Sequence, residues 1–221
     1  MAEGTSLQLV PLALDLSGRR CVCVGGGSVA ARRVAALVAA GGLLTVIAPE
    51  LDPVLDGMVA EGAIEARRRR YEAGDLGGAF LVLAATGTRA VDEAVREEAR
   101  AVGALLNTAG ETGRGDCQFM AVVRRGPLLV GLQTGGAAPA VTAALRARIE
   151  ASLAPDLESV LEGVGAFRAR LRSAIPDATE RAGRWRRVVE GGSLDAALDG
   201  GGEAALARIE AILLGDAGAG E

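Results

Sequence analysis

The sequence predicts an α/β fold in which a parallel sheet flanked by helices is followed by a mostly helical region. Half of the 221 residues are apolar, mostly Ala, Val and Leu, with 32 Gly and few aromatic residues. Small side chains of this kind suit helices that pack closely on a parallel sheet. Short apolar runs alternate with segments of helical periodicity as far as residue 138, and only helical periodicity follows.

Five apolar runs and one alternating segment predict strands, and three segments between them predict helices. The strands lie within residues 19–24, 43–49, 62–71, 78–86, 104–109 and 126–136, and the helices within 28–42, 51–62 and 89–103. The order strand, glycine turn, helix, strand over residues 19–49 is one βαβ unit of a parallel sheet. Four consecutive arginines at 67–70 end the third strand, where alternate residues would face opposite sides, and we interpret them as solubilising an edge strand.

The C-terminal part of the chain has a different pattern. Its four predicted helices lie within residues 139–153, 156–175, 177–192 and 193–215. We therefore predict a sheet domain of residues 1–138 and a helical region of residues 139–221. That region has too few residues to bury both faces of its helices. We therefore predict that it forms a homodimer interface.

The composition excludes several classes of partner. A net charge of −4 argues against nucleic-acid binding. No uninterrupted apolar run approaches the ~20 residues of a membrane span, and the N-terminus lacks the basic region of a leader, so we expect a soluble protein. Three cysteines, Cys21, Cys23 and Cys117, predict a reducing cytoplasm. The chain has no histidine, so any proton transfer falls to a carboxylate, Lys/Arg, Tyr, Cys or water.

The turn "VGGGSVAARR" joins the first strand to the first helix and has the spacing of a dinucleotide-binding motif. Gly25 allows the tight turn, Gly27 leaves space between the backbone and a pyrophosphate, and the small Ala30 lets the helix pack on the strand. Glu50, after the second strand, is placed to bind the ribose and favours NAD over NADP, because a carboxylate repels a 2′-phosphate. The alternative is a glycine turn that binds no ligand. We predict a Rossmann-type NAD-binding domain.

Several further motifs resemble one family. "GGGSVAARR", "TVIAPEL", "FLVLAAT", "LNTAG", "RRGPLLVGLQTGGAAPAVTAALRARIE" and "RWRRVVE" occur in order. Together they resemble the N-terminal module of siroheme synthases and its free-standing relatives, over nearly all of residues 7–190. These relatives are precorrin-2 dehydrogenases, and some are also sirohydrochlorin ferrochelatases. No methyltransferase module follows in this sequence, so we expect the free-standing form.

The resemblance implies NAD-dependent oxidation of precorrin-2 to sirohydrochlorin by a homodimer, in siroheme or cobalamin biosynthesis, with insertion of Fe²⁺ as a second step in some members. By similarity, Ser28, Val29, Pro49, Glu50 and Thr86 contact the cofactor. The substrate is a tetrapyrrole with eight carboxylates, which guanidinium groups pair with well. The predicted substrate-binding residues are Asn107, Arg124, Arg125, Thr134, Gly135 and Gly136.

One position departs from the family pattern. Members carry an Asp shortly after the Asn of the fifth strand, and this sequence has Gly110 there. Three explanations stay open: Glu111 replaces the missing acid, Asp116 does so, or one function, most plausibly chelation, is lost. We predict Glu111 and Asp116 as the catalytic residues, and no resident metal. Cys117 could bind Fe²⁺, but an isolated cysteine is more often a small buried apolar residue.

Two rival functions remain at this point. The chain could be a non-catalytic NAD(H)-binding or tetrapyrrole-binding member of the family, in which neither Glu111 nor Asp116 faces the cleft. It could also be an unrelated NAD-dependent oxidoreductase of the same fold, which the segment "TGGAAP" argues against.

Overall fold

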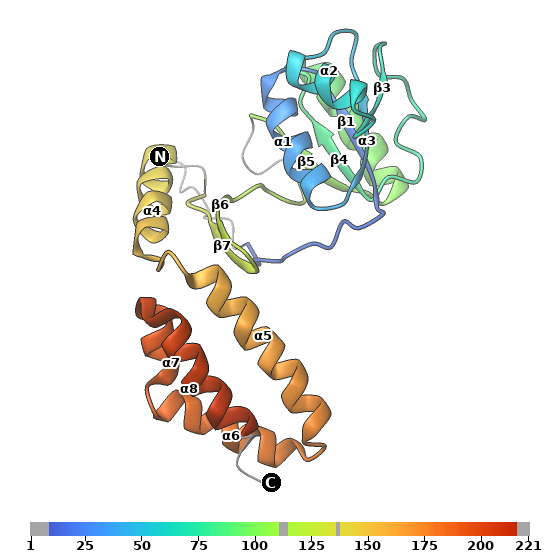
Figure 1. The fold of residues 1–221 in the computed structure, drawn as a ribbon. Coiled ribbons are helices and arrows are strands. Elements are labelled where there is room, and N and C mark those ends of the chain that lie inside the picture. The colour runs from blue at the N-terminus through green and yellow to red at the C-terminus, as the bar shows by residue number, and fades with distance from the viewer. Residues whose placement is uncertain (1–8, 111–114, 136–137, 216–221) are drawn as a thin grey trace. The chain divides into compact units, whose positions relative to one another are not determined.

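A computed structural model describes residues 9–110, 115–135 and 138–215, which form two compact units (Figure 1). The first unit is Met1–Phe119 and the second is Met120–Glu221. Packing therefore divides the chain after Phe119, whereas the change in sequence pattern places a domain boundary after residue 138. That domain boundary stays a prediction. Among the described residues, no helix is both long enough and apolar enough to span a membrane.

The first unit is built on a parallel five-stranded sheet in the order β3-β2-β1-β4-β5. The strands are β1 (Arg20–Val24), β2 (Leu43–Ile47), β3 (Glu65–Arg67), β4 (Leu81–Ala84) and β5 (Leu105–Thr108). The register aligns Val24 with both Ile47 and Ala84, and Ala84 with Thr108, so four strands end at one edge of the sheet. The predicted α/β class is confirmed. Strands buried on both faces need continuous apolar runs, which explains why composition identified them.

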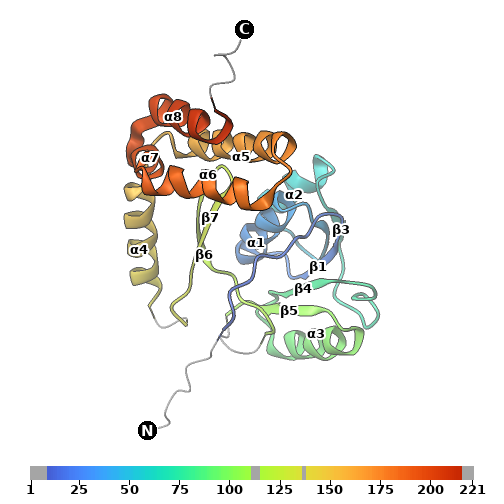
Figure 2. The same ribbon diagram turned by 90° about the horizontal axis from the view of Figure 1, so that it is seen from below.

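Three helices cover this sheet, two on one face and one on the other (Figure 2). They are α1 (Ser28–Ala39), α2 (Pro53–Ala60) and α3 (Arg89–Val102). Val34 of α1 and Leu55 of α2 pack into one fully buried cluster, while Val95 and Ala99 of α3 pack into a second. The single apolar stripe of each helix is therefore buried against the sheet, as helical periodicity predicted.

The first turns of α1 and α2 differ. The Asp52 carboxylate accepts a hydrogen bond from the Val54 N–H at 3.0 Å, and Pro53 occupies the first helical position. These are standard start signals of a helix. By contrast, α1 begins after Gly27 without a side-chain cap and without an acidic residue in its first turn.

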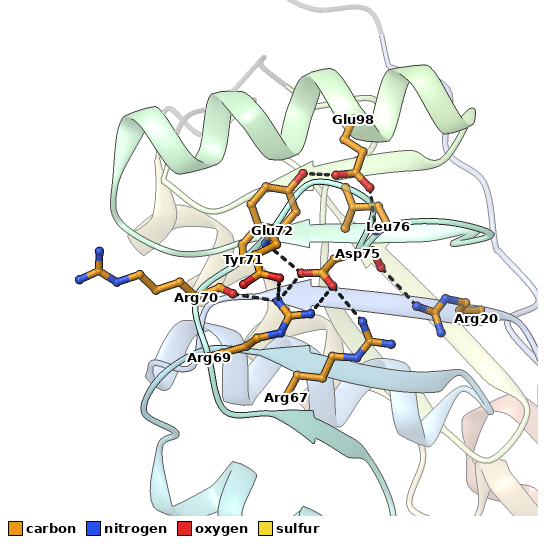
Figure 3. A network of polar contacts seen from close by, with 9 residues as sticks. All are labelled: Arg20, Arg67, Arg69, Arg70, Tyr71, Glu72, Asp75, Leu76 and Glu98. Carbon is orange, nitrogen blue, oxygen red and sulfur yellow. Dashed lines mark hydrogen bonds and ion pairs between the residues drawn. The ribbon is translucent and has the colours of Figure 1, made fainter.

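The run of four arginines lies where β3 ends, at the edge of the sheet. Only Arg67 belongs to the strand, so the predicted alternation over residues 67–70 was wrong. Arg69 binds the buried Asp75 carboxylate through two guanidinium nitrogens at 2.6 and 2.7 Å, and Arg67 adds a third contact at 2.9 Å (Figure 3). The Glu72 N–H donates to the same carboxylate. The Arg69 hydrogen bond, followed by this backbone N–H, holds the pKa of Asp75 down at about 2 against the opposing effect of burial.

A second contact ties the same segment to α3. The Tyr71 hydroxyl donates to the Glu98 carboxylate, which also accepts the Leu76 N–H at 2.8 Å (Figure 3). Residues 68–80 connect β3 to β4 without a helix. Hydrogen bonds to the Asp75 and Glu98 carboxylates therefore hold this crossover in place, although it has no helix to pack against the sheet.

The second unit combines a two-stranded antiparallel sheet with helices. The strands are β6 (Ala121–Arg125) and β7 (Leu128–Leu132), and the helices are α4 (Pro139–Ser152), α5 (Leu157–Ala174), α6 (Ala178–Glu190), α7 (Ser193–Ala196), η1 (Ala197–Gly201) and α8 (Gly202–Leu214). The sequence predicted β7 but missed β6, and the two form a hairpin separate from the parallel sheet. The segment 193–215 is not one helix, because it kinks at Gly200, whose φ is 91°.

The helical core of this unit is formed by α5, α6, α7, η1 and α8. Its buried members are Val160, Phe167, Leu171, Val188, Ala197, Ala205, Ile209 and Leu213. The helix α4 contributes no buried residue, and its Val141 and Leu145 are exposed. The predicted helical region is confirmed, and its helix α4 adds no buried residue to this core.

Candidate functional site

Consecutive glycines are required where β1 turns into α1. Gly25 has a φ of +120°, and a Cβ placed on it would lie 2.2 Å from the Ala85 carbonyl oxygen. A Cβ on Gly26 would lie 2.1 Å from the Glu50 carbonyl oxygen. Both distances are far below van der Waals contact, and both partners are backbone atoms that cannot rotate away. The role predicted for Gly25 as the tight-turn residue fits this geometry, whereas the need for Gly26 was missed.

Gly27 and the first turn of α1 leave room for a ligand. A Cβ on Gly27 would meet no described atom within 4 Å. The first intrahelical hydrogen bond runs from the Ala31 N–H to the Gly27 carbonyl, so the N–H groups of Ser28, Val29 and Ala30 have no acceptor within the helix. Ala30 itself is fully buried, as a small residue between helix and strand should be. This open, uncapped helix start suits a phosphate group.

Pro49 and Glu50 follow β2 and are both exposed. The Glu50 backbone packs against Gly26, while its carboxylate bonds to no other residue that the structure describes. The neighbouring Asp52 differs, because its carboxylate caps α2. A free carboxylate at the end of β2 is the group that binds ribose hydroxyls in dinucleotide-binding folds. The donors at α1 and the acceptor at Glu50 therefore fit a dinucleotide.

Thr86, after β4, already has protein partners. Its hydroxyl lies 2.7 Å from the Asp92 carboxylate of α3 and accepts the Thr88 N–H at 3.0 Å. The hydroxyl donates its single proton within the protein, so any contact to a cofactor would use its remaining lone pair, its methyl group or the backbone. The predicted role of Thr86 at the cofactor stays a prediction.

Asn107, in β5, is buried, and both its amide oxygen and its amide nitrogen bond within the protein. Its Oδ1 accepts a hydrogen bond from the Arg33 guanidinium of α1 at 2.5 Å, and its Nδ2 donates to the Cys117 carbonyl at 2.8 Å. Only 3% of Asn107 is exposed. Sequence reasoning placed Asn107 at the substrate, and that role stays a prediction. It did not foresee the partner Arg33, although this residue closes the motif "GGGSVAARR".

The segment after β5 contains the predicted catalytic acids. Gly110 is exposed with a φ of +95°, and Glu111 lies outside the described residues. Asp116 is exposed, yet its carboxylate accepts the Leu106 N–H at 3.0 Å, and its own N–H donates to the Leu106 carbonyl at 2.8 Å. Asp116 therefore fastens the end of this segment to β5. Its catalytic role stays a prediction, with one carboxylate oxygen already engaged.

Cys117 has the character of a half-buried thiol. Its Sγ lies 3.6 Å from the Leu106 carbonyl oxygen. Burial, followed by the charge of Asp116, raises the pKa of Cys117 to about 11. A thiol with such a pKa is protonated at neutral pH, and metals bind the thiolate. The described ranges also contain no group of three or more His, Cys, Asp or Glu residues placed to hold a metal ion.

The other predicted substrate residues lie in the second unit. Arg124 is exposed in β6, and Arg125 precedes the hairpin turn. The Thr134 hydroxyl lies 2.7 Å from the Thr142 hydroxyl, which joins the exit of β7 to the first turn of α4. Gly135 is exposed with a φ of +65°, and Gly136 lies outside the described residues.

The sheet order, the glycine turn and the acid after β2 define a Rossmann-type dinucleotide-binding unit. Residues 12–121 match a family model described as "Putative NAD(P)-binding", and residues 157–213 match one described as "Sirohaem synthase dimerisation region". The chain belongs to the family of the siroheme synthase N-terminal module, in which an NAD(P)-binding region precedes a dimerisation region.

Individual proteins agree with this assignment. The chain is 34% identical over 204 residues to a siroheme synthase of Chromobacterium violaceum, covering 92% of this chain and 43% of that protein. It is 36% identical over 197 residues to a siroheme synthase of Methylococcus capsulatus, covering 89% and 42%. The chain thus spans less than half the length of these relatives. A solved structure named "SirC, precorrin-2 dehydrogenase" has the same fold, with a TM-score of 0.73, 22% identity, and coverage of 91% of this chain and 99% of that one.

Proposed function

We propose that this protein catalyses the NAD-dependent oxidation of precorrin-2 to sirohydrochlorin. The observation that carries the proposal is the open glycine turn with an uncapped α1 and a free Glu50 carboxylate, in a chain that matches both regions of the siroheme synthase N-terminal module. The names of the siroheme synthase relatives and of the structurally similar precorrin-2 dehydrogenase support the choice of substrate.

Each predicted cofactor residue has a role in this proposal. The N–H groups of Ser28 and Val29 bind the pyrophosphate, and the small Gly27 lets it approach the backbone. The Glu50 carboxylate accepts hydrogen bonds from the ribose hydroxyls and disfavours a 2′-phosphate, which is why we propose NAD rather than NADP. When bound, NAD⁺ supplies the hydride acceptor, and the protein supplies position and electrostatics.

The protein also has to bind a polyanionic substrate and remove a proton. We assign carboxylate binding to Arg124 and Arg125, because guanidinium groups pair with carboxylates. We assign the proton acceptor first to Glu111 and second to Asp116, since Asp116 already accepts the Leu106 N–H. Water is the remaining acceptor in a chain without histidine.

We further propose that the protein acts as a homodimer. The match to a dimerisation region supports this, as does α4, which buries none of its residues within one chain and exposes Val141 and Leu145. Sedimentation at micromolar concentration should give a dimer mass. A cytoplasmic location stays a prediction, and free Cys21, Cys23 and Cys117 fit a reducing compartment.

The decisive assay is anaerobic incubation of precorrin-2 with NAD⁺, in which sirohydrochlorin and NADH are followed by their absorbance. We expect both to form in equal amounts, with NADP⁺ a poorer acceptor. The variant Glu50→Gln should reduce the difference in oxidation rate between NAD⁺ and NADP⁺. The variant Glu61→Gln, which changes an exposed acid after α2, should leave that difference unchanged. Protein that is dimeric and binds NAD⁺ yet forms no sirohydrochlorin would instead support a non-catalytic binding role.

Insertion of Fe²⁺ is a separate question, because Gly110 stands where family members carry an acid. Adding Fe²⁺ to the finished oxidation reaction measures it directly. A rate equal to that of protein-free solution means that chelation is absent. A faster rate that Glu111→Gln abolishes assigns the missing carboxylate to Glu111.

A further inference from the structure

Arg33 is a charged residue whose side chain turns into the first unit instead of towards solvent. It lies six positions after Gly27 on α1, the helix whose first turn faces the proposed cofactor site. Its guanidinium donates to Asn107 Oδ1 at 2.5 Å and lies over the Phe119 ring, 5.4 Å from the centroid. Arg32, the preceding residue of the helix, is exposed and makes no hydrogen bond or ion pair with any described residue.

The bond from Arg33 determines how the Asn107 amide is oriented. A guanidinium can only donate, so it requires the amide oxygen, and the Cys117 carbonyl can only accept, so it requires the amide nitrogen. The two partners lie on opposite sides of the same buried side chain. Rotating the amide by half a turn would break both bonds, and Arg33 therefore selects the single orientation that holds the Cys117 backbone.

Cys117 and the preceding Asp116 close the end of the segment that leaves β5. Both N–H groups donate to the Leu106 carbonyl, and the Asp116 carboxylate accepts the Leu106 N–H. Through Asn107, Arg33 connects this junction to the cofactor helix by two hydrogen bonds in series, in addition to the packing of Cys117 against the core that α1 shares. We propose that Arg33 is a positioning residue, which couples α1 to the carboxyl end of β5 by fixing Asn107 and the Cys117 backbone.

Lysine should replace Arg33 only in part. A lysine ammonium can donate to Asn107, but it lacks the planar group that lies over Phe119. A hydrogen bond to a charged group is worth roughly 1.5–3 kcal/mol, so its loss should change a rate that depends on it by about tenfold or more. Arg33→Lys should therefore fall between the wild type and Arg33→Met.

Cys117 provides a reporter that does not depend on catalysis. It is half-buried, while Cys21 and Cys23 are buried, so a soluble disulfide reagent should modify Cys117 first. We expect Arg33→Met to raise the initial modification rate by about tenfold, with Arg33→Lys intermediate and Arg32→Met within about twofold of the wild type. Cys117→Ser identifies the reacting thiol. Wild-type rates in both Arg33 variants would overturn the proposal.

The number of thiols that react separates local loosening from unfolding. Local release of the Cys117 backbone exposes one thiol, whereas global unfolding exposes all three. Modification of all three at one rate in folded Arg33→Lys protein would mean that Arg33 only stabilises the unit, and would overturn the positioning role.

The kinetic test rests on the proposed function. In precorrin-2 oxidation, Arg33→Met should lower kcat by about tenfold and leave the Kd for NAD⁺, measured by titration, within about twofold. A Kd that rises as much as kcat falls would place Arg33 in cofactor binding instead. If the wild type forms no sirohydrochlorin, the proposed function fails, and the thiol measurements still decide the role of Arg33.

Discussion

The carboxyl ends of β1 and β5 lie at the same edge of the sheet, and each is followed by residues predicted to bind a ligand. After β1, the turn consists of three glycines, and its polar groups are backbone N–H groups without an acceptor in α1. After β5, the polar groups belong to side chains, and those of Asn107 and Asp116 already bond to the protein. The first region leaves its N–H groups open, whereas the described side chains Asn107 and Asp116 of the second are bonded to the protein.

This difference separates two ways of building a site. A pyrophosphate needs several donors that point at one place, and a helix start provides them without any side chain. A loop that must hold a reacting substrate needs a fixed backbone, and buried hydrogen-bonded side chains provide that rigidity. The side chains around Asp75 are also bonded to one another, but they lie at the β3–β4 crossover, outside the proposed site, and so provide a comparison for effects on stability.

The largest effect should come from adding one methyl group to the glycine turn. Gly26→Ala would place a Cβ 2.1 Å from the Glu50 carbonyl oxygen and 2.8 Å from the Ala48 Cβ. We expect it to lower the free energy of unfolding by more than about 3 kcal/mol, measured by urea denaturation.

Gly27→Ala is the matched control for that change. The Gly27 backbone is extended, with φ −80° and ψ −178°, and the added Cβ would meet no atom of the described residues within 4 Å. Stability should stay within about 0.5 kcal/mol of the wild type, while the Kd for NAD⁺ rises because the methyl group enters the proposed cofactor space. Tight NAD⁺ binding by Gly27→Ala would contradict the assignment of this space to the cofactor.

The second largest effect should come from Asn107, in the region of β5 where the described side chains bond to the protein. Asn107→Ala leaves the Arg33 guanidinium and the Cys117 carbonyl without their partner, and unpaired buried polar groups should cost about 3 kcal/mol in the free energy of unfolding. Thiol modification of Cys117 should also become faster. Asp75→Asn, which weakens a network elsewhere in the unit, should leave that thiol rate unchanged, and an equal increase would mean that the two networks are one cooperative structure.

Asp75 should give a smaller effect that depends on pH. Its pKa is lowered from 3.8 to about 2 in the folded protein, so its stabilisation is complete above the unfolded pKa and is lost as the pH falls from about 4 to about 2. At neutral pH, Asp75→Asn should cost about 2 kcal/mol, and the stability curves of variant and wild type should converge in acid. Glu97→Gln, an exposed acid of α3, should show neither effect.

The smallest effect concerns the position where the family acid is missing. A Cβ on Gly110 would meet no described atom within 4 Å, but the φ of this residue is +95°, so Gly110→Asp should cost about 1–2 kcal/mol in backbone strain. We expect it to accelerate Fe²⁺ insertion into sirohydrochlorin by restoring a carboxylate. Gly110→Asn carries a similar strain without charge, and equal insertion rates in the two variants would show that the carboxylate is not what this position lacks.

Local sequence signals were sufficient for most of the fold. The apolar runs identified β1, β2, β4 and β5, because a strand buried on both faces cannot alternate with polar residues. The edge strand β3 is exposed and was indicated by an alternating segment instead. Helix starts such as Asp52-Pro53 are also local signals. Two errors came from local signals that were read wrongly. β6 was missed because its short apolar run ends in two arginines. The helix predicted over 193–215 breaks at Gly200, the first of three consecutive glycines that mark a helix break.

The sequence by itself determined the glycine turn, the acid after β2 and the family, because these depend on residue types at fixed spacings along the chain. Only the tertiary structure decided which polar groups remain open. Arg33 meets Asn107 across 74 positions and Tyr71 meets Glu98 across 27, while Gly26 is required by the carbonyl of Glu50. Such pairings depend on how strands and helices pack, and no spacing within one segment encodes them.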